Sequence, residues 1–100
     1  MPSKKKTTDT QQLAAVRNEI DQLDEQIQAL ISARARLANR VRASKGEFVH
    51  AVDYYRPERE AQVLRNVIQR NQGPLTDSEM VRLFREIMSA CLAQPEPRKI

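Results

Sequence analysis

Tryptophan is absent from this chain, and only four residues are aromatic, two phenylalanines and two tyrosines. Glycine is scarce as well, with two positions. Strands favour aromatic and β-branched residues, whereas Ala, Leu, Gln, Glu and Arg, which are abundant here, lose little side-chain freedom in a helix. The composition therefore predicts an all-helical fold, and a length of 100 residues predicts one small domain.

The single cysteine, Cys91, excludes an internal disulfide. No run of about 18 apolar residues could cross a bilayer, and the basic start MPSKKKTTDT lacks the apolar stretch of a secretory signal. We therefore expect a cytoplasmic protein with no membrane partner. The formal net charge of +4 fits nucleic acid, a membrane surface or a small anionic ligand, so the placement of the arginines must decide.

Apolar residues alternate at spacings of three and four in the first half of the chain, and one arginine takes an apolar place. The series is Leu13, Val16, Ile20, Leu23, Ile27, Leu30, Arg34, Leu37 and Val41. This is the pattern of a helix that packs along a seam, and no Gly or Pro interrupts it before Gly46. We predict one helix of about 33 residues, roughly 50 Å long, after a disordered basic tail at residues 1–11.

A compact domain of this size measures roughly 35 Å across, so such a helix extends beyond its own domain. Its apolar stripe then needs a second chain to cover it. We therefore expect an intertwined homodimer in which the long helices pair. Residues 12–94 form the expected domain, and residues 95–100 form a C-terminal tail.

Two shorter helices are expected in the second half of the chain. Pro57 at a first helical position and Glu58 in the first turn predict a helix over about 57–71, which the sequence NQGP ends. Thr76 and Glu79 form a T-x-x-E capping box that opens a third helix of medium length. The predicted architecture is all-α, with one long, one short and one medium helix.

Arg34 stands where the period calls for an apolar residue. A guanidinium in a helix interface needs an anionic partner, because leaving it unpaired costs several kcal/mol. The partner is either a carboxylate of a neighbouring helix or an anionic ligand held by the planar fork of the arginine. For Arg34 alone, the structural ion pair is the simpler interpretation.

Two other cations make a ligand more attractive. Lys45 follows Arg34 by 11 residues and shares its helix face at about 16 Å. Arg17 precedes Arg34 by 17 residues, or roughly 25 Å, and cannot reach the same small molecule from the same chain. In an antiparallel dimer, Arg17 of one protomer can approach Arg34 and Lys45 of the other. Taken singly, Arg17 and Lys45 are more simply solvated charges.

Three segments carry a resemblance: LAAVRNEIDQLDEQIQALISARARLANRVRASK, YYRPEREAQVL and MVRLFREIMSACLA. They contain R-x-x-I-D-x-L-D, an arginine ten residues later, a lysine eleven further on, and R-E at the start of the second helix. Over about residues 12–93 the chain resembles the all-helical chorismate mutase family, in particular the mutase domain at the front of bifunctional chorismate mutase–prephenate dehydratases.

The resemblance implies the rearrangement of chorismate to prephenate in phenylalanine and tyrosine biosynthesis. It implies that Arg34 and the partner protomer's Arg17 hold the two carboxylates of chorismate, while Lys45 donates to the ether oxygen of the breaking bond. This unimolecular pericyclic reaction needs no nucleophile, proton shuttle, metal or cofactor, and we expect none. His50, the single histidine, is then a loop residue.

The same resemblance extends the site. It implies that Glu60 accepts the ring hydroxyl, that Arg59 supports the cationic site, and that Arg56 contacts the ligand through its backbone. Cys91 stands where some members have a serine that lines the carboxylate pocket. We give Cys91 a substrate-binding place but no catalytic role, because a thiol donates weakly.

One position departs from the family pattern. Members usually carry a glutamine or glutamate one helical turn after position 91, where this chain has Pro95. Gln94 could take over the contact to the substrate if the third helix ends differently, and proline does end helices. Reduced activity, or a mutase-like regulator without activity, therefore stays open.

Two further alternatives stay open as well. One is isochorismate pyruvate lyase, which uses the same fold and a similar cationic pocket. The other is a structural coiled-coil or nucleic-acid-binding dimer. We expect no nucleic-acid partner, because the basic residues do not gather with aromatics on an exposed face and Arg34 interrupts the seam itself. Arg36, Arg40 and Arg42 are interpreted as solvated or structural charges.

Overall fold

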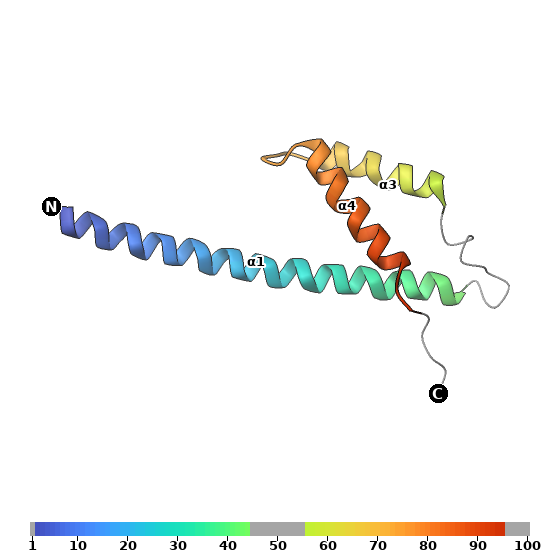
Figure 1. The fold of residues 1–100 in the computed structure, drawn as a ribbon, viewed down its shortest axis with the longest axis horizontal. Helices are drawn as coiled ribbons and strands as arrows, with labels where there is room; N and C mark the ends of the chain where they lie inside the picture. Colours follow the sequence, from blue (N-terminus) through green and yellow to red (C-terminus); the bar gives the residue numbers. More distant parts are fainter. Residues whose placement is uncertain (1, 45–55, 96–100) are drawn as a thin grey trace, which may run out of the picture. The chain divides into compact units, whose positions relative to one another are not determined.

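The computed structural model of the chain describes residues 2–44 and 56–95. Its three helices are α1 (Pro2–Ser44), α3 (Pro57–Arg70) and α4 (Asp77–Leu92), shown in Figure 1. The described residues contain no β-strand, so the prediction of an all-helical chain with three helices is confirmed. In this part of the chain, no helix is both long enough and apolar enough to cross a membrane.

Helix α1 is longer than the sequence predicts. It has 43 residues and begins at Pro2, whereas the predicted start lies near residue 12. The physical reason is that Pro2 occupies a first helical position, where its missing N–H costs nothing, and no Gly or Pro follows it before Gly46. The helical backbone thus includes residues 2–11, which were expected to form a disordered tail. The division into a tail and a domain stays a prediction.

The chain divides within α1 into two units, Met1–Ser32 and Ala33–Ile100, where the sequence predicts one domain. In the first unit every described side chain, from residue 9 to residue 32, is exposed. Six large apolar residues of its stripe are between 50% and 69% exposed: Leu13, Val16, Ile20, Leu23, Ile27 and Leu30. A helical segment cannot cover its own apolar stripe, so in a single copy this stripe faces solvent.

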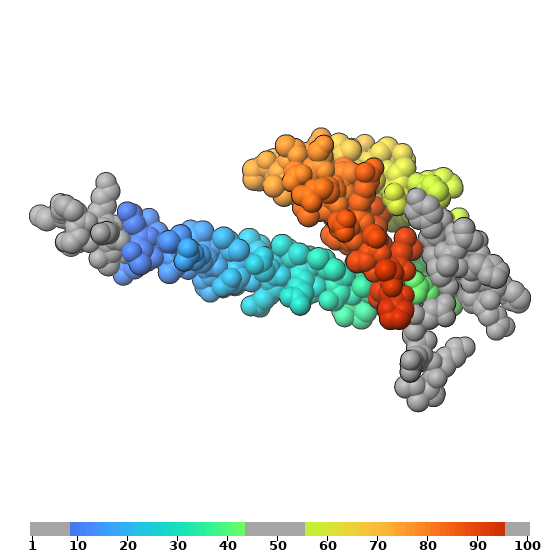
Figure 2. All heavy atoms as spheres, in the orientation of Figure 1, coloured from blue at the N-terminus to red at the C-terminus, as the bar shows by residue number. Residues whose placement is uncertain are grey.

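The second unit has a small apolar core where α3 and α4 pack against each other. Leu64 and Val67 of α3 are buried, as are Met88 and Cys91 of α4. Each pair is spaced three residues apart, which puts both of its side chains on one helix face. Figure 2 shows the atoms of α3, in yellow and yellow-green, beside those of α4, in orange and red.

Asn71 fixes the turn between α3 and α4. Its Oδ1 accepts from the backbone N–H of Gly73 at 3.3 Å, and its Nδ2 donates to the carbonyl of Leu75 at 2.9 Å and to Oδ1 of Asp77 at 2.8 Å. Gly73 has a φ of +79°, in the left-handed region that glycine adopts without steric cost. The stop predicted at NQGP is confirmed, because α3 ends at Arg70.

The capping box of α4 is half formed. The Thr76 Oγ1 accepts from the backbone N–H of Glu79 at 3.2 Å, as predicted. The Glu79 carboxylate instead accepts from the Arg82 guanidinium at 3.0 Å, and the two form an exposed ion pair. This hydrogen bond and the attraction between the two charges hold the pKa of Glu79 below its ordinary range.

Candidate active site

A cavity of about 370 Å³ is lined by residues of α1 between positions 34 and 42, the first turns of α3 with Arg56, and the C-terminal half of α4. Its walls are largely apolar. They are formed by Leu37, Ala38 and Val41 of α1, Val63 of α3, and Met88 and Leu92 of α4. A concave apolar surface of this kind suits the ring of a small molecule.

The charged groups of the cavity are mostly cationic. Four of its lining residues are arginines and one is a glutamate: Arg34, Arg42, Arg56, Arg59 and Glu60. Low-dielectric walls strengthen the field of such groups in a cleft. The cavity is therefore suited to a small anion that also carries an apolar ring.

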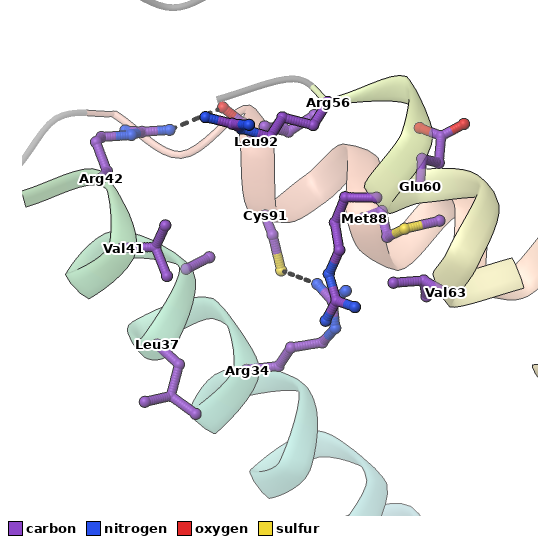
Figure 3. Close-up of a pocket in the computed structure, with 12 residues that line it drawn as sticks. Arg34, Leu37, Val41, Arg42, Arg56, Glu60, Val63, Met88, Cys91 and Leu92 are labelled. Atoms are coloured by element: carbon purple, nitrogen blue, oxygen red, sulfur yellow. Dashed lines mark hydrogen bonds between the residues drawn. The ribbon is translucent and has the colours of Figure 1, made fainter. Parts of the chain in front are cut away.

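Arg34 lies at the centre of this arrangement. Figure 3 shows its side chain reaching from α1 towards α3 and α4, with the Glu60 carboxylate pointing away from it. Its Nη1 donates to the Cys91 sulfur at 3.4 Å. Among the residues that the structure describes, no carboxylate forms an ion pair with Arg34. The simpler interpretation from the sequence, a structural ion pair, thus has no support in this part of the chain.

Cys91 is 5% exposed and belongs to the cavity wall. Its sulfur accepts the hydrogen bond from Arg34 rather than donating one. Sulfur is a weak acceptor, so this contact orients the guanidinium without neutralising its charge. The structure therefore brings Arg34 and Cys91 together at the cavity.

The N-cap and the first turn of α3 supply three of the polar lining residues. Arg56, Arg59 and Glu60 are spaced as i, i+3 and i+4, which places them on one helix face. The Glu60 backbone N–H donates to the Arg56 carbonyl at 2.9 Å, so the turn is closed. The Arg59 Nη1 donates to Gln62 Oε1 at 2.9 Å, and both arginines are exposed.

Arg42 connects α1 to the end of α4. Its Nη2 donates to the Leu92 carbonyl (Figure 3), and its Nη1 donates to the Gln94 carbonyl, both at 3.1 Å. A cation at a helix C-terminus compensates the negative end of the helix dipole and satisfies carbonyls that have no partner within the helix. The interpretation of Arg42 as a structural charge fits these contacts, although its place in the cavity wall was not predicted.

Gln94 is not part of the cavity lining. Its Nε2 donates to the carbonyls of Ala35 at 3.0 Å and Cys91 at 2.9 Å, and its Oε1 accepts from Asn39 Nδ2 at 2.9 Å. A direct substrate contact, as expected from the sequence, would require its amide to leave these partners.

For Arg17 and Lys45, a place at the site stays a prediction. Arg17 belongs to the first unit, Met1–Ser32, and does not line the cavity. Lys45 lies outside the described residues, as does His50. Within the described ranges, no group of three or more His, Cys, Asp or Glu side chains is arranged to hold a metal ion.

Sequence reasoning missed Val63 and Asn39. Val63 follows Glu60 by three residues and Arg59 by four, so the helical period was a signal that it shares their face. Asn39 carried no comparable signal, because its partner Gln94 is 55 residues away in the sequence.

The sequence profile described as chorismate mutase type II matches residues 16–96 of the chain. The chain belongs to the chorismate mutase type II family. The resemblance proposed from the sequence motifs is thereby confirmed.

Known members of this family are similar over most of the chain. A bifunctional chorismate mutase/prephenate dehydratase from Pseudomonas aeruginosa is 50% identical over 95 residues, covering 92% of this chain and 26% of the relative. One from Neisseria gonorrhoeae is 48% identical over 84 residues, covering 84% of this chain and 22% of the relative. The chain thus spans about a quarter of the length of these curated relatives.

A solved structure is also similar to this chain. The chorismate mutase (form II) of Thermus thermophilus is 32% identical, with a TM-score of 0.69. The match covers 81% of this chain and 90% of that one. The chain therefore shares the all-helical fold of a known chorismate mutase.

Proposed function

We propose that this chain catalyses the rearrangement of chorismate to prephenate, and that its product serves phenylalanine and tyrosine biosynthesis. The observation that carries the proposal is Arg34. Its guanidinium is half-buried in an apolar-walled cavity, and no carboxylate pairs with it among the described residues. A buried cation in that setting calls for an anionic ligand. Membership of the chorismate mutase family makes the dicarboxylate chorismate the fitting substrate.

The protein forms no covalent bond with the substrate in this reaction. The ether C–O bond breaks as a new C–C bond forms within one molecule, and no group leaves. The protein can hold the substrate in a compact reactive conformation and place positive charge where the ether oxygen becomes negative. Four arginines and apolar walls provide such a setting.

Individual roles follow from this chemistry. Arg34 holds one carboxylate through two parallel hydrogen bonds, and the partner subunit's Arg17 holds the other. Lys45 donates to the ether oxygen. Glu60 accepts the ring hydroxyl, and Arg59 adds to the positive field.

Arg56 and Cys91 complete the proposed binding site. Arg56 contacts the substrate through its backbone, and the Cys91 sulfur orients Arg34, which it already contacts at 3.4 Å. We give Gln94 a positioning role in place of a substrate contact.

A homodimer with paired long helices is part of the proposal. The apolar stripe of α1 is at least half exposed from Leu13 to Leu30, and Leu37 and Val41 are each 56% exposed. A continuous exposed apolar stripe is typical of a surface that binds another chain. The helix period makes a second copy of the same stripe a suitable partner.

Charge along α1 favours antiparallel pairing. Residues 13–28 contain one basic and four acidic residues, whereas residues 29–44 contain four basic residues and no acidic one. Antiparallel copies place the acidic half of each helix beside the basic half of the other, and parallel copies place like charges together.

The same pairing accounts for Arg17. The stripe from Leu13 to Val41 is centred on Ile27. Antiparallel pairing about that centre sets Arg17 opposite Leu37 of the partner subunit, about one helical turn from Arg34 of the partner subunit. Each cavity would then combine Arg34 of its own chain with the partner subunit's Arg17.

The experiment that tests this function offers chorismate and isochorismate separately to the purified protein. We expect chorismate to be consumed with formation of prephenate and no pyruvate. Release of pyruvate from isochorismate would identify a lyase. Turnover of neither substrate, together with salt-dependent retention on DNA, would favour a binding protein. A cytoplasmic location stays a prediction.

A further inference from the structure

We infer that Gln94 is a positioning residue, which holds the end of α4 against α1 and so keeps Arg34 and Cys91 in place without touching the substrate. The inference rests on the proposed function for its effect on turnover. It stands on hydrogen bonds of Gln94 that join the two helices beside the cavity.

Every polar group of the Gln94 side chain is engaged by the protein. Its amide has two N–H donors, and Nε2 donates to the carbonyls of Ala35 and Cys91 at 3.0 and 2.9 Å. Its Oε1 accepts from Asn39 Nδ2 at 2.9 Å. These partners lie on both helices, so Gln94 ties α4 to α1.

The two carbonyls that accept from Gln94 lie beside the contact between Arg34 and Cys91. Ala35 is the neighbour of Arg34 on α1, and the Arg34 guanidinium donates to the Cys91 sulfur. Gln94 therefore fixes the backbone of Cys91 and the backbone next to Arg34 relative to each other. A shift of the α4 end would move the sulfur away from the guanidinium.

Pro95 explains why a side chain, and not a backbone N–H, donates to the Cys91 carbonyl. In a continuing helix, the Cys91 carbonyl would accept from the backbone N–H of residue 95, four positions on. Pro95 has no N–H, and α4 ends at Leu92. The Gln94 Nε2 supplies the missing donor to the Cys91 carbonyl. The backbone donor that Pro95 lacks is thus replaced within the protein.

Asn39 and Arg42 hold Gln94 in this position. The two carbonyls that accept from Nε2 fix the orientation of the Gln94 amide. Asn39 must then donate from its Nδ2 to the Gln94 Oε1. This orientation leaves the Asn39 Oδ1 buried and without a partner among the described atoms. Arg42 adds a bond to the Gln94 backbone carbonyl at 3.1 Å.

The test compares Gln94→Ala with Gln69→Ala, a control at an exposed glutamine of α3. Cys91 is the single cysteine of the chain and is 5% exposed, so its rate of modification by Ellman's reagent reports on the packing of α4. We expect Gln94→Ala to raise this rate about tenfold and to lower kcat/KM for chorismate about tenfold or more, because small displacements of catalytic groups are costly. Gln69→Ala should change neither.

Further measurements separate the other outcomes. A loss of kcat/KM with an unchanged labelling rate would show direct contact with the substrate and overturn the inference. A lower midpoint of thermal unfolding with unchanged kcat/KM would show that the bonds stabilise α4 alone, and would also overturn it. If the wild-type protein does not act on chorismate, the proposed function fails, and the labelling rate still decides whether Gln94 holds α4.

Two more variants keep the inference testable if Gln94→Ala does not fold. Gln94→Glu keeps the side-chain length and the acceptor for Asn39 but removes both donors, so it should show the same two effects. Asn39→Ala combined with Gln94→Ala should be no worse than Gln94→Ala alone, because both residues act through one set of bonds. Additive losses in the double variant would contradict the arrangement.

Discussion

The Arg34 guanidinium of α1 donates to the Cys91 sulfur of α4 at 3.4 Å, and both residues line one cavity. The contact joins the arginine that breaks the apolar stripe to a residue of the α4 core. It gives the guanidinium a fixed direction while leaving it without a carboxylate in the described part of the chain. The rest of the proposed site is arranged around this pair.

The role of the sulfur can be tested with two substitutions at Cys91. Cys91→Ser keeps an acceptor for Arg34, so we expect kcat/KM to stay within a few-fold of the wild-type value. Cys91→Val removes the acceptor and keeps the apolar packing. Loss of a hydrogen bond to a charged group costs about 1.5–3 kcal/mol, so kcat/KM should fall at least about tenfold. Equal activities of the two variants would show that the contact does not matter for turnover.

The shared site predicts complementation between inactive variants. Arg17→Ala and Arg34→Ala should each be inactive as homodimers. When the two are unfolded together in equal amounts and refolded, half of the dimers are mixed, and each mixed dimer holds one intact site. We expect about a quarter of the wild-type activity to return. Continued absence of activity, with mixed dimers demonstrated by mass spectrometry, would show that Arg17 does not act across the interface.

Lys45 is expected to provide the charge at the ether oxygen. Lys45→Ala should lower kcat by about a hundredfold, or roughly 3 kcal/mol, while circular dichroism and dimer mass stay unchanged. Lys99→Ala is a suitable control because it removes the same charge from the expected C-terminal tail. Near-normal turnover by Lys45→Ala would remove this residue from the mechanism.

The exposed pair of Glu79 and Arg82 predicts a pH effect on α4. Because the pKa of Glu79 is lowered in the folded state, its contribution to stability is present above the unfolded-state pKa and is lost as the pH falls through the folded-state pKa. An NMR titration should show the Glu79 carboxyl titrating below the ordinary range, and Arg82→Ala should move its midpoint upwards. An unchanged midpoint would contradict the assignment of Arg82 as the cause.

Local signals in the sequence predicted α3 and α4 well. Pro57 and the sequence NQGP bound α3, and Thr76 caps α4, because each acts through its own backbone geometry or a neighbour three residues away. The predicted start of α1 was wrong, because the polar composition of residues 2–11 indicates disorder but includes no residue that breaks a helix. Composition indicates how little apolar surface a segment can bury, but it does not show where a helix begins.

Less of the candidate site than of the helices could be predicted from the sequence. The helical period singled out Arg34, and the family motifs pointed to Glu60 and Cys91. The bonds of Gln94 and Arg42 could not be predicted, because they join α1 to the end of α4 across more than 50 residues of sequence. Spacing within one helix carries no information about such contacts.

The most direct measurement of the central claim is the rate of chorismate consumption by Arg34→Ala and Arg36→Ala, compared with the wild-type protein. Arg36 lies two residues further along α1, is exposed and does not line the cavity. We predict that the wild-type protein and Arg36→Ala convert chorismate at similar rates. Arg34→Ala should lose at least about a hundredfold in kcat/KM while staying folded. Equal rates for Arg34→Ala and the wild-type protein would contradict the assignment of this cavity as the active site.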